Sequence, residues 1–321
     1  MTRTHKIHPD DAGQRLDRYL RKLLPKATLG HIFKLIRTKQ VRINGGRVEA
    51  ATRLEVGDIV EIEKEAHELR ELTRKKSSPT KKGQPKRRFK IDVLYEDEHI
   101  AAVIKPRGLA VHGGSGQVDS LVERLPELFG ASAARTFKPS PAHRLDLETS
   151  GIVLVGKTAE ALRALHEALR EGQVRKRYLA LVRGVPRQHH GSIEKALVRR
   201  DDARGAKMQI AEDPSDAAAL AARTQFRVLA SKSGHALLSV EIETGRTHQI
   251  RAHLASIHAP LVGDQRYGGG TLAAAPSPGF WLHAGRIDFI HPGDGREMHL
   301  RAEPPADFLA VAAALGLPEL G

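Results

Sequence analysis

The stretch HRLDLETSGIVLVGKT, residues 143–158, joins a polar loop to a short apolar run and fits two incompatible interpretations. Its second half matches the phosphate-binding pattern G-x-x-x-x-G-K-[ST], with Gly151 and Gly156 as the two glycines. Its first half places Asp146 shortly before a Thr-Ser-Gly sequence. The first interpretation predicts a nucleotide-binding loop, and the second predicts a reactive carboxylate at the edge of a strand.

The four residues between the glycines decide between these interpretations. A phosphate-binding loop must turn so that its backbone N–H groups converge on the anion. Here the four residues are Ile-Val-Leu-Val, which are β-branched or bulky and suit an extended, buried strand. The pattern also follows a polar loop, whereas a phosphate-binding loop follows a strand. We therefore interpret residues 151–156 as a strand and expect no nucleotide cofactor.

The segments around this strand predict a large α+β domain over residues 91–321 with a mixed, mostly antiparallel sheet. The sequence AEALRALHEALREG, which follows directly, has apolar residues at helical spacing and Thr158 as its N-cap. A further helix is expected in HQIRAHLASIHA, residues 248–259, with Thr247 as its N-cap. Apolar stretches typical of strands and hairpins occupy residues 91–106, 176–184, 224–245 and 281–292.

Residues 14–65 predict a small N-terminal domain with an αα-then-β order. Apolar residues recur at helical spacing in two short segments, residues 16–24 and 32–36. The sequence VRINGGRVE, residues 41–49, predicts a strand, a turn and another strand, and LEVGDIVEI adds a closing strand. Four basic residues gather around the second helix and the turn, namely Arg37, Lys39, Arg42 and Arg47.

Between the two domains, residues 66–90 have a different composition. The sequence RELTRKKSSPTKKGQPKRRFK, residues 70–90, carries ten Lys or Arg against one Glu and almost no large apolar residue. Such a segment buries too little apolar surface to offset its chain entropy, so we expect a disordered, self-repelling linker. Two roles are open for it, a spacer alone or a spacer that also holds phosphates non-specifically.

The composition narrows the class of protein. The chain has 321 residues, a formal net charge of +14 and no Cys. The lack of Cys excludes disulfides and thiolate metal sites and suits a cytoplasmic protein. No apolar run reaches membrane-spanning length. We expect a polyanionic partner, either nucleic acid or an anionic membrane surface, and the segregation of the basic residues favours nucleic acid.

Three polar groups in the large domain indicate chemistry. Asp146 lies in the loop before the strand, and Tyr178 lies in a strand beside two basic residues. The third group crowds the start of a helix with more polar residues than capping requires, namely Arg246, His248, Gln249, Arg251 and His253. Its histidines are five residues apart, which does not bring them onto one helical face, so we expect no metal site.

The stretches HRLDLETSG, KRYLALVRG and TGRTHQIRAHL, in that order behind a small N-terminal domain, resemble the RluA-type family of RNA pseudouridine synthases. RLDRYL, VRINGGRV and VGDIVEI resemble the S4 RNA-binding domain. GLAVHGGSG, GDQRYG and WLHAGRI are similar to a subgroup that acts on large-subunit ribosomal RNA. The resemblance begins at residue 14 and covers nearly the whole chain, but the Lys-rich linker and the short stretch TLAAAPSPG depart from the family pattern.

The resemblance implies an enzyme that isomerises a uridine already present in RNA. Such an enzyme breaks the N-glycosidic bond, rotates the base and rejoins the ribose through carbon five, with no cofactor. We therefore expect pseudouridine formation in bacterial 23S ribosomal RNA by a monomeric, cytoplasmic protein that does not bind membranes. Two alternatives stay open: the same chemistry on other rRNA or tRNA uridines, and an RNA-binding assembly factor without activity.

The resemblance also implies roles for single residues. Asp146 matches the catalytic carboxylate, which acts at the sugar as nucleophile or as base. Arg251 matches the basic partner that keeps this carboxylate ionised. Tyr178 matches the tyrosine that packs beside the target base and assists proton removal late in the reaction. The alternative for Tyr178 is a core tyrosine of an edge strand.

The remaining candidates are expected to contact RNA. Arg144 matches the residue that fills the stack vacated by the extruded nucleotide, since its guanidinium is planar; the alternative is an arginine that binds a phosphate or an acid. Arg246 and His248 are expected to contact phosphates or to support the loop. In the S4-like domain the expected RNA contacts are Arg37, Lys39, Arg42 and Arg47.

Overall fold

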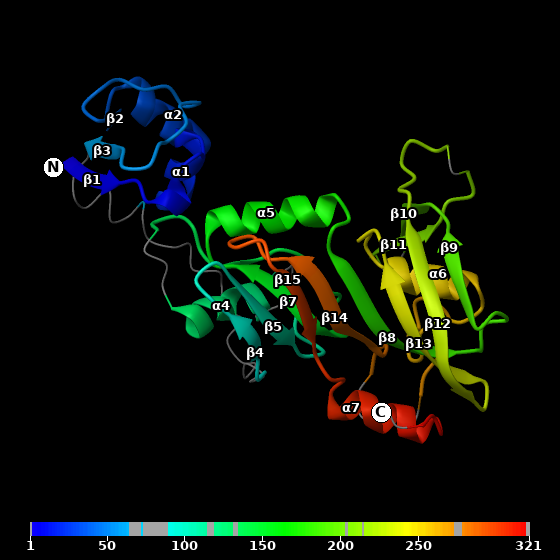
Figure 1. Ribbon diagram of the computed structural model, residues 1–321. Coiled ribbons are helices and arrows are strands. Elements are labelled where there is room, and N and C mark those ends of the chain that lie inside the picture. Colours follow the sequence, from blue (N-terminus) through cyan, green and yellow to red (C-terminus); the bar gives the residue numbers. More distant parts are fainter. Residues whose placement is uncertain are drawn as a thin grey trace, which may run out of the picture.

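The computed structural model describes residues 2–63, 72, 89–113, 119–130, 134–202, 205–213, 215–272 and 278–318. They form a small N-terminal unit and a large unit built on one broad sheet (Figure 1). The predicted α+β class, with a mixed and mostly antiparallel sheet, is confirmed. The expected linker at residues 66–90 lies almost entirely outside the described residues.

The N-terminal unit packs two short helices against a three-stranded sheet in the order β1-β3-β2. Leu16, Leu20 and Leu35 are buried between these elements, as the helical spacing of the apolar residues predicted. The expected order of two helices followed by strands is confirmed, with β1 as an additional edge strand. The elements are β1 (Thr2–Lys6), the 3-10 helix η1 (Pro9–Asp11), α1 (Leu16–Leu23), α2 (Leu29–Arg37), β2 (Val41–Ile43) and β3 (Ile59–Glu63).

The hairpin expected at residues 41–49 forms only in its first half. Asn44 (φ 51°) and Gly45 (φ 76°) make the turn, but residues 47–49 are not a strand. The chain runs from the turn toward α1, where the carbonyl groups of residues 50 and 52 accept hydrogen bonds from the N–H groups of its first turn. The N–H groups in the first turn of a helix have no acceptor within the helix, so they compete for the carbonyl groups that strand pairing would otherwise use. β2 pairs with β3 instead.

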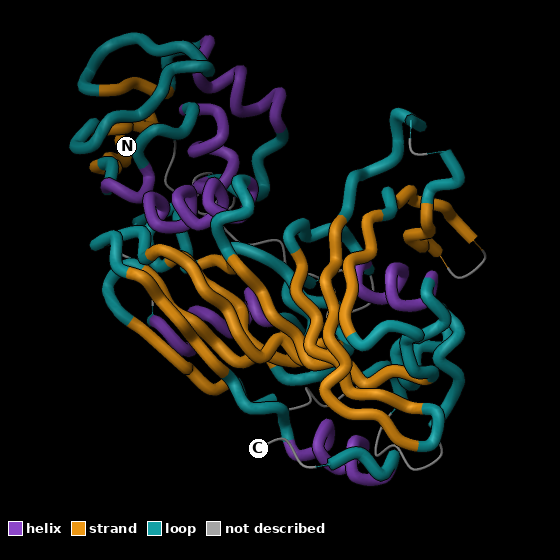
Figure 2. The backbone as a smooth tube through the Cα atoms, turned by 45° about the vertical axis from the view of Figure 1, so that its right-hand side comes forward, coloured by secondary structure: helices purple, strands orange, loops and turns teal. Residues whose placement is uncertain are grey.

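The large unit is organised around a ten-stranded sheet in the order β4-β5-β7-β14-β8-β13-β12-β9, with β15 paired to β14 and β6 to β7. β7 and β14 are parallel, and the other pairs of neighbours are antiparallel. Figure 2 shows these strands as one continuous, twisted layer. The strands are β4 (Asp92–Glu96), β5 (Ile100–Lys105), β6 (Ser140–Pro141), β7 (Thr149–Gly156), β8 (Arg175–Arg183), β9 (His190–Glu194), β12 (Arg223–Lys232), β13 (His235–Ile242), β14 (Leu282–Ile290) and β15 (Glu297–Arg301), while β10 (Leu197–Asp202) and β11 (Gly205–Ile210) form a separate hairpin.

The strand β7 contains the apolar run on which the two interpretations of residues 143–158 depended. All of its residues are buried. Ile152 and Leu154 pack into one core cluster, and Val153 and Val155 pack into another, because successive side chains of a strand point to opposite faces. A strand covered on both faces has no convergent backbone N–H groups to offer a phosphate, so the nucleotide-binding interpretation is wrong.

Gly151 allows β7 and β14 to approach each other closely. Its φ angle is 118°, and a Cβ atom at this position would lie 2.3 Å from the carbonyl oxygen of Ala284. Residues 149–151 pair with residues 282–284 in the parallel register. Any larger residue at position 151 would therefore push apart the two strands at the end of β7 that follows the Asp146 loop.

The helices of the large unit cover the sheet. α5 packs on β7 and begins at the predicted N-cap, since the hydroxyl of Thr158 accepts a hydrogen bond from the Ala161 N–H (3.1 Å). α7 buries Phe308 and Val311 against β8, β13 and Trp281, the residue before β14. No helix within the described ranges combines the length and apolarity that a membrane span requires. The helices are α4 (Leu121–Phe129), α5 (Ala159–Arg170), α6 (Gln249–Ser256) and α7 (Ala306–Ala314).

The start of α6 differs from the expectation. Its N-cap is His248, in the left-handed conformation (φ 52°), and not Thr247. The side chain of Gln249 holds the preceding turn, because its Oε1 accepts hydrogen bonds from the Thr244 hydroxyl (2.7 Å) and the Arg246 N–H (3.1 Å). Among the described residues, no side-chain hydrogen bond caps the start of α6, and the Gln249 amide instead orders the turn that leads into the helix.

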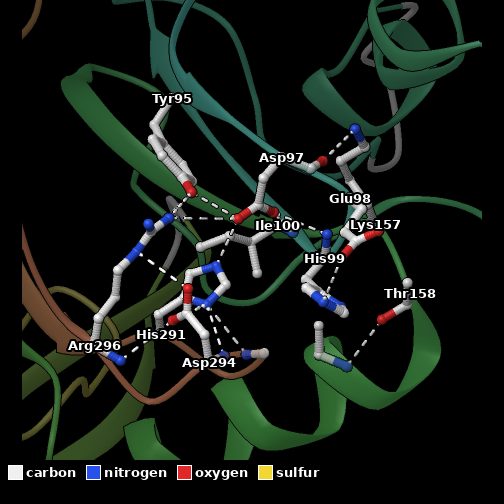
Figure 3. A network of polar contacts seen from close by, with 12 residues as sticks. Tyr95, Asp97, Glu98, His99, Ile100, Lys157, Thr158, His291, Asp294 and Arg296 are labelled. Carbon is white, nitrogen blue, oxygen red and sulfur yellow. Dashed lines mark hydrogen bonds and ion pairs between the residues drawn. The ribbon is translucent and has the colours of Figure 1, made fainter.

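A polar network joins the β4–β5 turn to the β14–β15 turn (Figure 3). The Asp97 carboxylate accepts hydrogen bonds from the Tyr95 hydroxyl (2.6 Å) and the Ile100 N–H (2.8 Å), and it lies 2.7 Å from Nε2 of the buried His291. Partial burial acts to raise the pKa of Asp97, but these hydrogen bonds outweigh it and lower the pKa to about 2. The network stabilises the sheet by joining residues that are 194 positions apart.

Candidate active site

A pocket of about 480 Å³ lies between the loop before β7, the second half of α5, the strand β8 and the start of α6. Segments that are far apart in the sequence therefore meet around one hollow. It is lined by all six residues of the large domain for which the resemblance implies a role, namely Arg144, Asp146, Tyr178, Arg246, His248 and Arg251.

Asp146 lies on the tight loop between β6 and β7. Its carbonyl accepts a hydrogen bond from the Thr149 N–H (3.1 Å), and the neighbouring Leu145 is buried. An ion pair also restrains the loop, because Oε2 of Glu148 lies 3.2 Å from Nη2 of Arg107. The side chain of Asp146 is 21% exposed, so its carboxylate faces the pocket from a backbone that has little freedom.

Lys105, at the end of β5, supports the same loop. The lysine is fully buried, and its Nζ donates hydrogen bonds to the carbonyl groups of Leu109 (2.7 Å), Pro106 (3.0 Å) and Leu147 (3.2 Å). Burial lowers the pKa of Lys105 to about 7, although the charges of Glu148 and Asp146 act in the opposite direction. Because Leu147 directly follows Asp146, this contact fixes the position of the carboxylate.

His143 anchors the other end of the loop. Its Nε2 accepts a hydrogen bond from the Leu154 N–H of β7 (3.2 Å). Burial lowers the pKa of His143 to about 3, and the charge of Lys176 acts in the same direction. The ring is therefore neutral at neutral pH, which agrees with a structural role for this histidine.

Arg251 connects Asp146 to a second carboxylate, Asp264. Its Nε and Nη2 donate to the two oxygens of Asp264 at 2.7 and 3.0 Å, and its Nη1 lies 3.3 Å from Oδ2 of Asp146. Burial acts to lower the pKa of Arg251, but the hydrogen bonds and charge of Asp264, together with the charge of Asp146, outweigh it and raise the pKa. The arginine is thus a fixed cation beside the Asp146 carboxylate.

Two aromatic rings hold the guanidinium of Arg251 in place. Its Cζ lies 4.3 Å from the ring centre of Phe280 and 4.9 Å from that of Tyr267. The Tyr267 hydroxyl donates to the Met208 carbonyl (2.8 Å) and lies 3.1 Å from Nδ1 of His248. Burial lowers the pKa of His248, so its ring is mainly neutral at neutral pH. His248 and Arg251 therefore share Tyr267 as a common support.

Tyr178 enters the pocket from the middle of β8. Its backbone is opposite Val240 on one side and Ala284 on the other, so it lies in a central strand and not in an edge strand. The side chain is 6% exposed and lines the pocket that Asp146 and Arg251 also line. Burial raises the pKa of Tyr178, and the charge of Asp146 adds to the effect. The hydroxyl is therefore protonated at neutral pH.

The arginines expected to contact RNA have different surroundings. Arg144 is exposed at the pocket. Nε of Arg246 donates to the Ala221 carbonyl (3.1 Å), which directs this side chain along the protein surface. The four basic residues of the N-terminal unit do not belong to this pocket. All four are exposed, and three of them border a separate hollow of about 420 Å³ beside Phe33, namely Arg37, Lys39 and Arg47, while Arg42 does not border it.

Sequence reasoning did not assign roles to Asp264 and Lys105, although both contact the functional residues. Asp264 stands in GDQRYG, which resembles the family, and Lys105 stands in residues 91–106, which predict strands. Charged residues are ordinarily exposed, so the sequence did not indicate that these two would be buried against the site. His253, in contrast, is structural, since its two ring nitrogens lie 2.9 Å from the Thr224 hydroxyl and the Lys195 carbonyl.

Comparison with known proteins adds evidence independent of this geometry. Residues 99–256 match the family model of RNA pseudouridylate synthase, and residues 14–60 match that of the S4 domain. The chain is 36% identical over 310 residues to ribosomal large subunit pseudouridine synthase C of Escherichia coli (strain K12), covering 94% of this chain and 92% of that protein. It is also 36% identical over 304 residues to the protein of the same name from Haemophilus ducreyi, covering 92% and 90%.

A solved structure agrees with the sequence relatives. Human RNA pseudouridylate synthase domain containing 4 superimposes with a TM-score of 0.59 at 26% identity, covering 71% of this chain and 94% of that chain. The sequence likeness extends over both units of the chain and is far more than a match of short motifs. The chain belongs to the RNA pseudouridine synthase family, whose members are isomerases, and it carries an S4 domain.

Proposed function

We propose that this protein converts uridine to pseudouridine in bacterial large-subunit (23S) ribosomal RNA, with Asp146 as the catalytic carboxylate. The names of the relatives at 36% identity support this substrate. A net charge of +14 and an S4 domain support an RNA partner. Since ribosomal RNA is the substrate, we expect the protein to act in the cytoplasm, and we expect a monomer.

One observation carries the proposal. Asp146 lies 3.3 Å from the buried guanidinium of Arg251, in a pocket that Tyr178 also lines. The pocket volume of about 480 Å³ falls in the range of small-molecule sites, about 300–1,000 Å³, so a single nucleotide is of suitable size. A fixed cation beside the carboxylate holds it in one orientation, which is what an attack on a sugar or the removal of a proton requires.

The reaction needs the uridine to leave the RNA stack, at a cost of a few kcal/mol. Asp146 then acts at the ribose as nucleophile or as base while the bond between carbon one of the sugar and nitrogen one of the base breaks. The base turns and forms a bond from its carbon five to the same sugar carbon. The proton on carbon five leaves, and nitrogen one gains a proton, so nothing is added to or lost from the RNA.

Tyr178 and Arg144 are proposed to assist at different stages. We propose that the ring of Tyr178 packs beside the base and that its hydroxyl takes part in the late proton transfer, which its position in the pocket wall supports. Arg144 borders both the pocket and an adjacent hollow next to Leu147 and Phe280. That rim position suits a planar side chain that replaces the extruded base. Arg246 and His248 are proposed to hold the flanking phosphates or the loop itself.

The N-terminal unit is proposed to bind RNA at a site separate from the pocket. We propose that residues 14–65 bind RNA through Arg37, Lys39, Arg42 and Arg47, that residues 66–90 form a basic linker, and that residues 91–321 form the catalytic domain. Exposed basic side chains next to the exposed ring of Phe33 support this RNA-binding role. Neutralised phosphates release counterions, so deleting residues 1–65 is expected to flatten the salt dependence of RNA affinity.

The test compares Asp146→Asn with Glu98→Gln, a change of the same kind at an exposed acid outside the pocket. We expect Asp146→Asn to lower the rate of pseudouridine formation on 23S rRNA at least about 10³-fold and to leave RNA affinity nearly unchanged. Glu98→Gln should match the wild type. An active Asp146→Asn enzyme would remove Asp146 from its proposed role.

The substrate is tested separately. Pseudouridine is mapped in the ribosomal and transfer RNA of a strain with the gene and of a strain without it. Loss of sites in 23S rRNA alone supports the proposal. Loss confined to tRNA or to 16S rRNA would establish the alternative substrate, and no loss in any RNA together with retained binding would indicate an assembly factor.

A further inference from the structure

Two adjacent acids attach the N-terminal unit to the large unit. Asp10 and Asp11 lie in η1, ahead of the residues that match the S4 domain. Both carboxylates accept hydrogen bonds from backbone groups of the large unit that are more than 120 residues away in the sequence. Figure 1 shows the N-terminal unit next to one end of α5, and η1 contacts this helix. This contact is separate from the covalent connection through residues 64–88.

Asp11 occupies a nest of donors in the loop before β6. Its Oδ2 accepts from the Arg135 N–H (2.7 Å), and its Oδ1 accepts from the Thr136 N–H (3.0 Å), the Thr136 hydroxyl (2.6 Å) and the Phe137 N–H (3.1 Å). Successive backbone N–H groups that converge on one carboxylate form an anion-binding concavity. The Asp11 side chain is completely buried, so water does not compete for these donors.

Asp10 reaches the first turn of α5. Its Oδ1 accepts from the N–H of Ala159 (2.7 Å), the first residue of the helix, while the N-cap Thr158 accepts from Ala161. The first N–H groups of a helix have no partner within the helix and carry its positive dipole end. A carboxylate from the N-terminal unit thus completes the cap of a helix in the large unit.

A buried tyrosine of the N-terminal unit lies close to Asp11. Tyr19, on α1, is fully buried, and its hydroxyl has no hydrogen-bond partner among the described residues. Burial raises the pKa of Tyr19 to about 12, and the charge of Asp11 adds to this effect. Gln14 contributes from the same side, since its amide donates to the Thr136 hydroxyl at 3.0 Å. Side chains of η1 and its neighbours therefore form a packed interface with the loop.

The helix that Asp10 caps also leads to the pocket. His166 and Arg170, in the second half of α5, line the same pocket as Asp146. They are seven and eleven residues after Ala159, and at 1.5 Å per residue this is about 10 to 16 Å along the helix. The docked unit and the candidate active site are therefore connected by one rigid element, and not only by the residues between the two domains.

We propose that Asp10 and Asp11 are positioning residues that determine which uridine is modified. They hold the S4 domain at a fixed distance from the pocket, so that RNA bound by both parts must present its uridine at a matching distance. This inference rests on the proposed function, because it assumes that the pocket receives uridine from RNA. Two binding parts on a flexible tether accept many spacings, whereas a rigid pair accepts few.

Docking is tested first without any RNA. The chain has no Cys, so Arg21→Cys on α1 and Arg163→Cys on α5, both exposed, can carry two spin labels and no others. Distances between the labels are measured by pulsed electron paramagnetic resonance in the full-length protein. We expect one narrow distribution in the parent protein. A broad distribution there would overturn the proposal, because no fixed spacing would exist.

Three variants then locate the contact. Asp11→Asn keeps the shape of the side chain but turns one acceptor into a donor that faces the Arg135 N–H, and Thr136→Val removes a donor from the opposite side. Both are expected to broaden the distance distribution. Asp17→Asn is the control, since Asp17 is a buried acid of the same unit that bonds to Arg15 and to the Arg18 N–H. A narrow distribution in Asp11→Asn would overturn the role of Asp11.

Specificity is tested on two RNAs, full-length 23S rRNA and a short hairpin that contains one uridine modified by the wild type. On 23S rRNA, Asp11→Asn should lose about tenfold or more in kcat/KM, because RNA bound by a loosely held S4 domain reaches the pocket at a lower effective concentration. The variant should also modify additional uridines. Its rate on the hairpin should equal that of the wild type, which also shows that the catalytic domain is folded. Asp17→Asn should retain both rates and the wild-type sites.

The outcomes separate this inference from the proposed function. If Asp11→Asn broadens the distances and yet modifies the same uridines at the same rate, docking does not select the site and the inference fails, while the function stands. An equal loss on both RNAs would show damage to the pocket and would also overturn it. If the wild type modifies no RNA, the proposed function fails, and the distance measurement still reports whether the two units dock.

Discussion

Arg251 makes its two shortest polar contacts with Asp264, at 2.7 and 3.0 Å, and only a longer contact of 3.3 Å with Asp146. The buried Asp264 therefore determines where the guanidinium points, and the guanidinium in turn faces Asp146. A bidentate pair restricts orientation as well as charge. Because Asp146 receives one contact and not two, most of its acceptor positions stay available for the RNA sugar.

Asp264→Asn should lower kcat and leave KM nearly unchanged. The change removes one of the two charged acceptors that orient Arg251, so we expect a loss of about 10–100-fold in kcat, as for other residues that orient a functional group. Breaking a buried ion pair should also lower the free energy of unfolding by about 3 kcal/mol. Asp288→Asn, at an acid paired with Arg286 outside the pocket, is the control for activity. Full activity of Asp264→Asn would contradict the positioning role.

Tyr178→Phe separates packing from proton transfer. The variant keeps the ring in β8 and removes only the hydroxyl, so RNA affinity should stay within about twofold. If the hydroxyl takes part in proton removal, the rate of pseudouridine formation should fall by about 10²–10⁴-fold, the usual range for such groups. Tyr95→Phe, in the network of Figure 3, is the matched control. An unchanged rate in Tyr178→Phe would leave Tyr178 as a core residue only.

His143→Gln should make the protein less sensitive to acid. The pKa of His143 is about 3 in the folded protein and about 6.5 when unfolded, so below pH 6.5 the unfolded chain binds a proton that the folded chain does not. Stability is therefore lost as the pH falls from 6.5 toward 3. From pH 7 to pH 5 the wild type should lose about 2 kcal/mol more than His143→Gln, at 1.36 kcal/mol per pH unit below 6.5.

Urea unfolding of both proteins at the two pH values measures this difference, and the titration of all other groups cancels in the comparison. Glutamine retains an acceptor for the Leu154 N–H without titrating, so the loop should stay in place at pH 7. Equal acid sensitivity of the two proteins would show that the ring is accessible to protons in the folded state.

Gly151→Ala should destabilise the protein strongly. An added Cβ would lie 2.3 Å from the Ala284 carbonyl oxygen, and φ at this position is 118°. Both effects oppose the pairing of β7 with β14, and we expect a loss of about 3 kcal/mol or more. Gly172→Ala is the control, since φ there is 72° and no atom lies within 4 Å of the added Cβ. Its expected cost is about 1–2 kcal/mol, and equal losses in the two variants would contradict the close contact.

Much of the fold was predictable because it depends on local patterns. The apolar run from Ile152 to Val155 predicted a buried strand, and Thr158 predicted the start of α5. Two expectations failed, a strand at residues 47–49 and an N-cap at Thr247. Directly after residues 47–49, the carbonyl groups of residues 50 and 52 are bonded to α1, whereas the turn before α6 is held by the side chain of Gln249. In the first place tertiary hydrogen bonds prevail over the local preference, and in the second a neighbouring amide side chain does.

The residue types of the candidate site were also readable in advance. Asp146, Tyr178 and Arg251 stand in motifs whose order is shared with a known family, and the pocket brings the three together. Lys105 and Asp264 carried no comparable signal. Their importance comes from burial and from their partners, and a local pattern does not show whether a charged side chain will be exposed or enclosed.

The sequence by itself determined the order of the elements, the two units and the chemical groups available for reaction, because helical and strand periodicity and motif order are properties of neighbouring residues. Only the tertiary structure decided that Arg251 is shared between two carboxylates and that Asp11 is enclosed by the loop at residues 135–137. The first pairing joins side chains from three separate segments and the second joins a carboxylate to distant backbone N–H groups, so both exist only after the chain has folded. The burial that strengthens them also exists only in the folded chain.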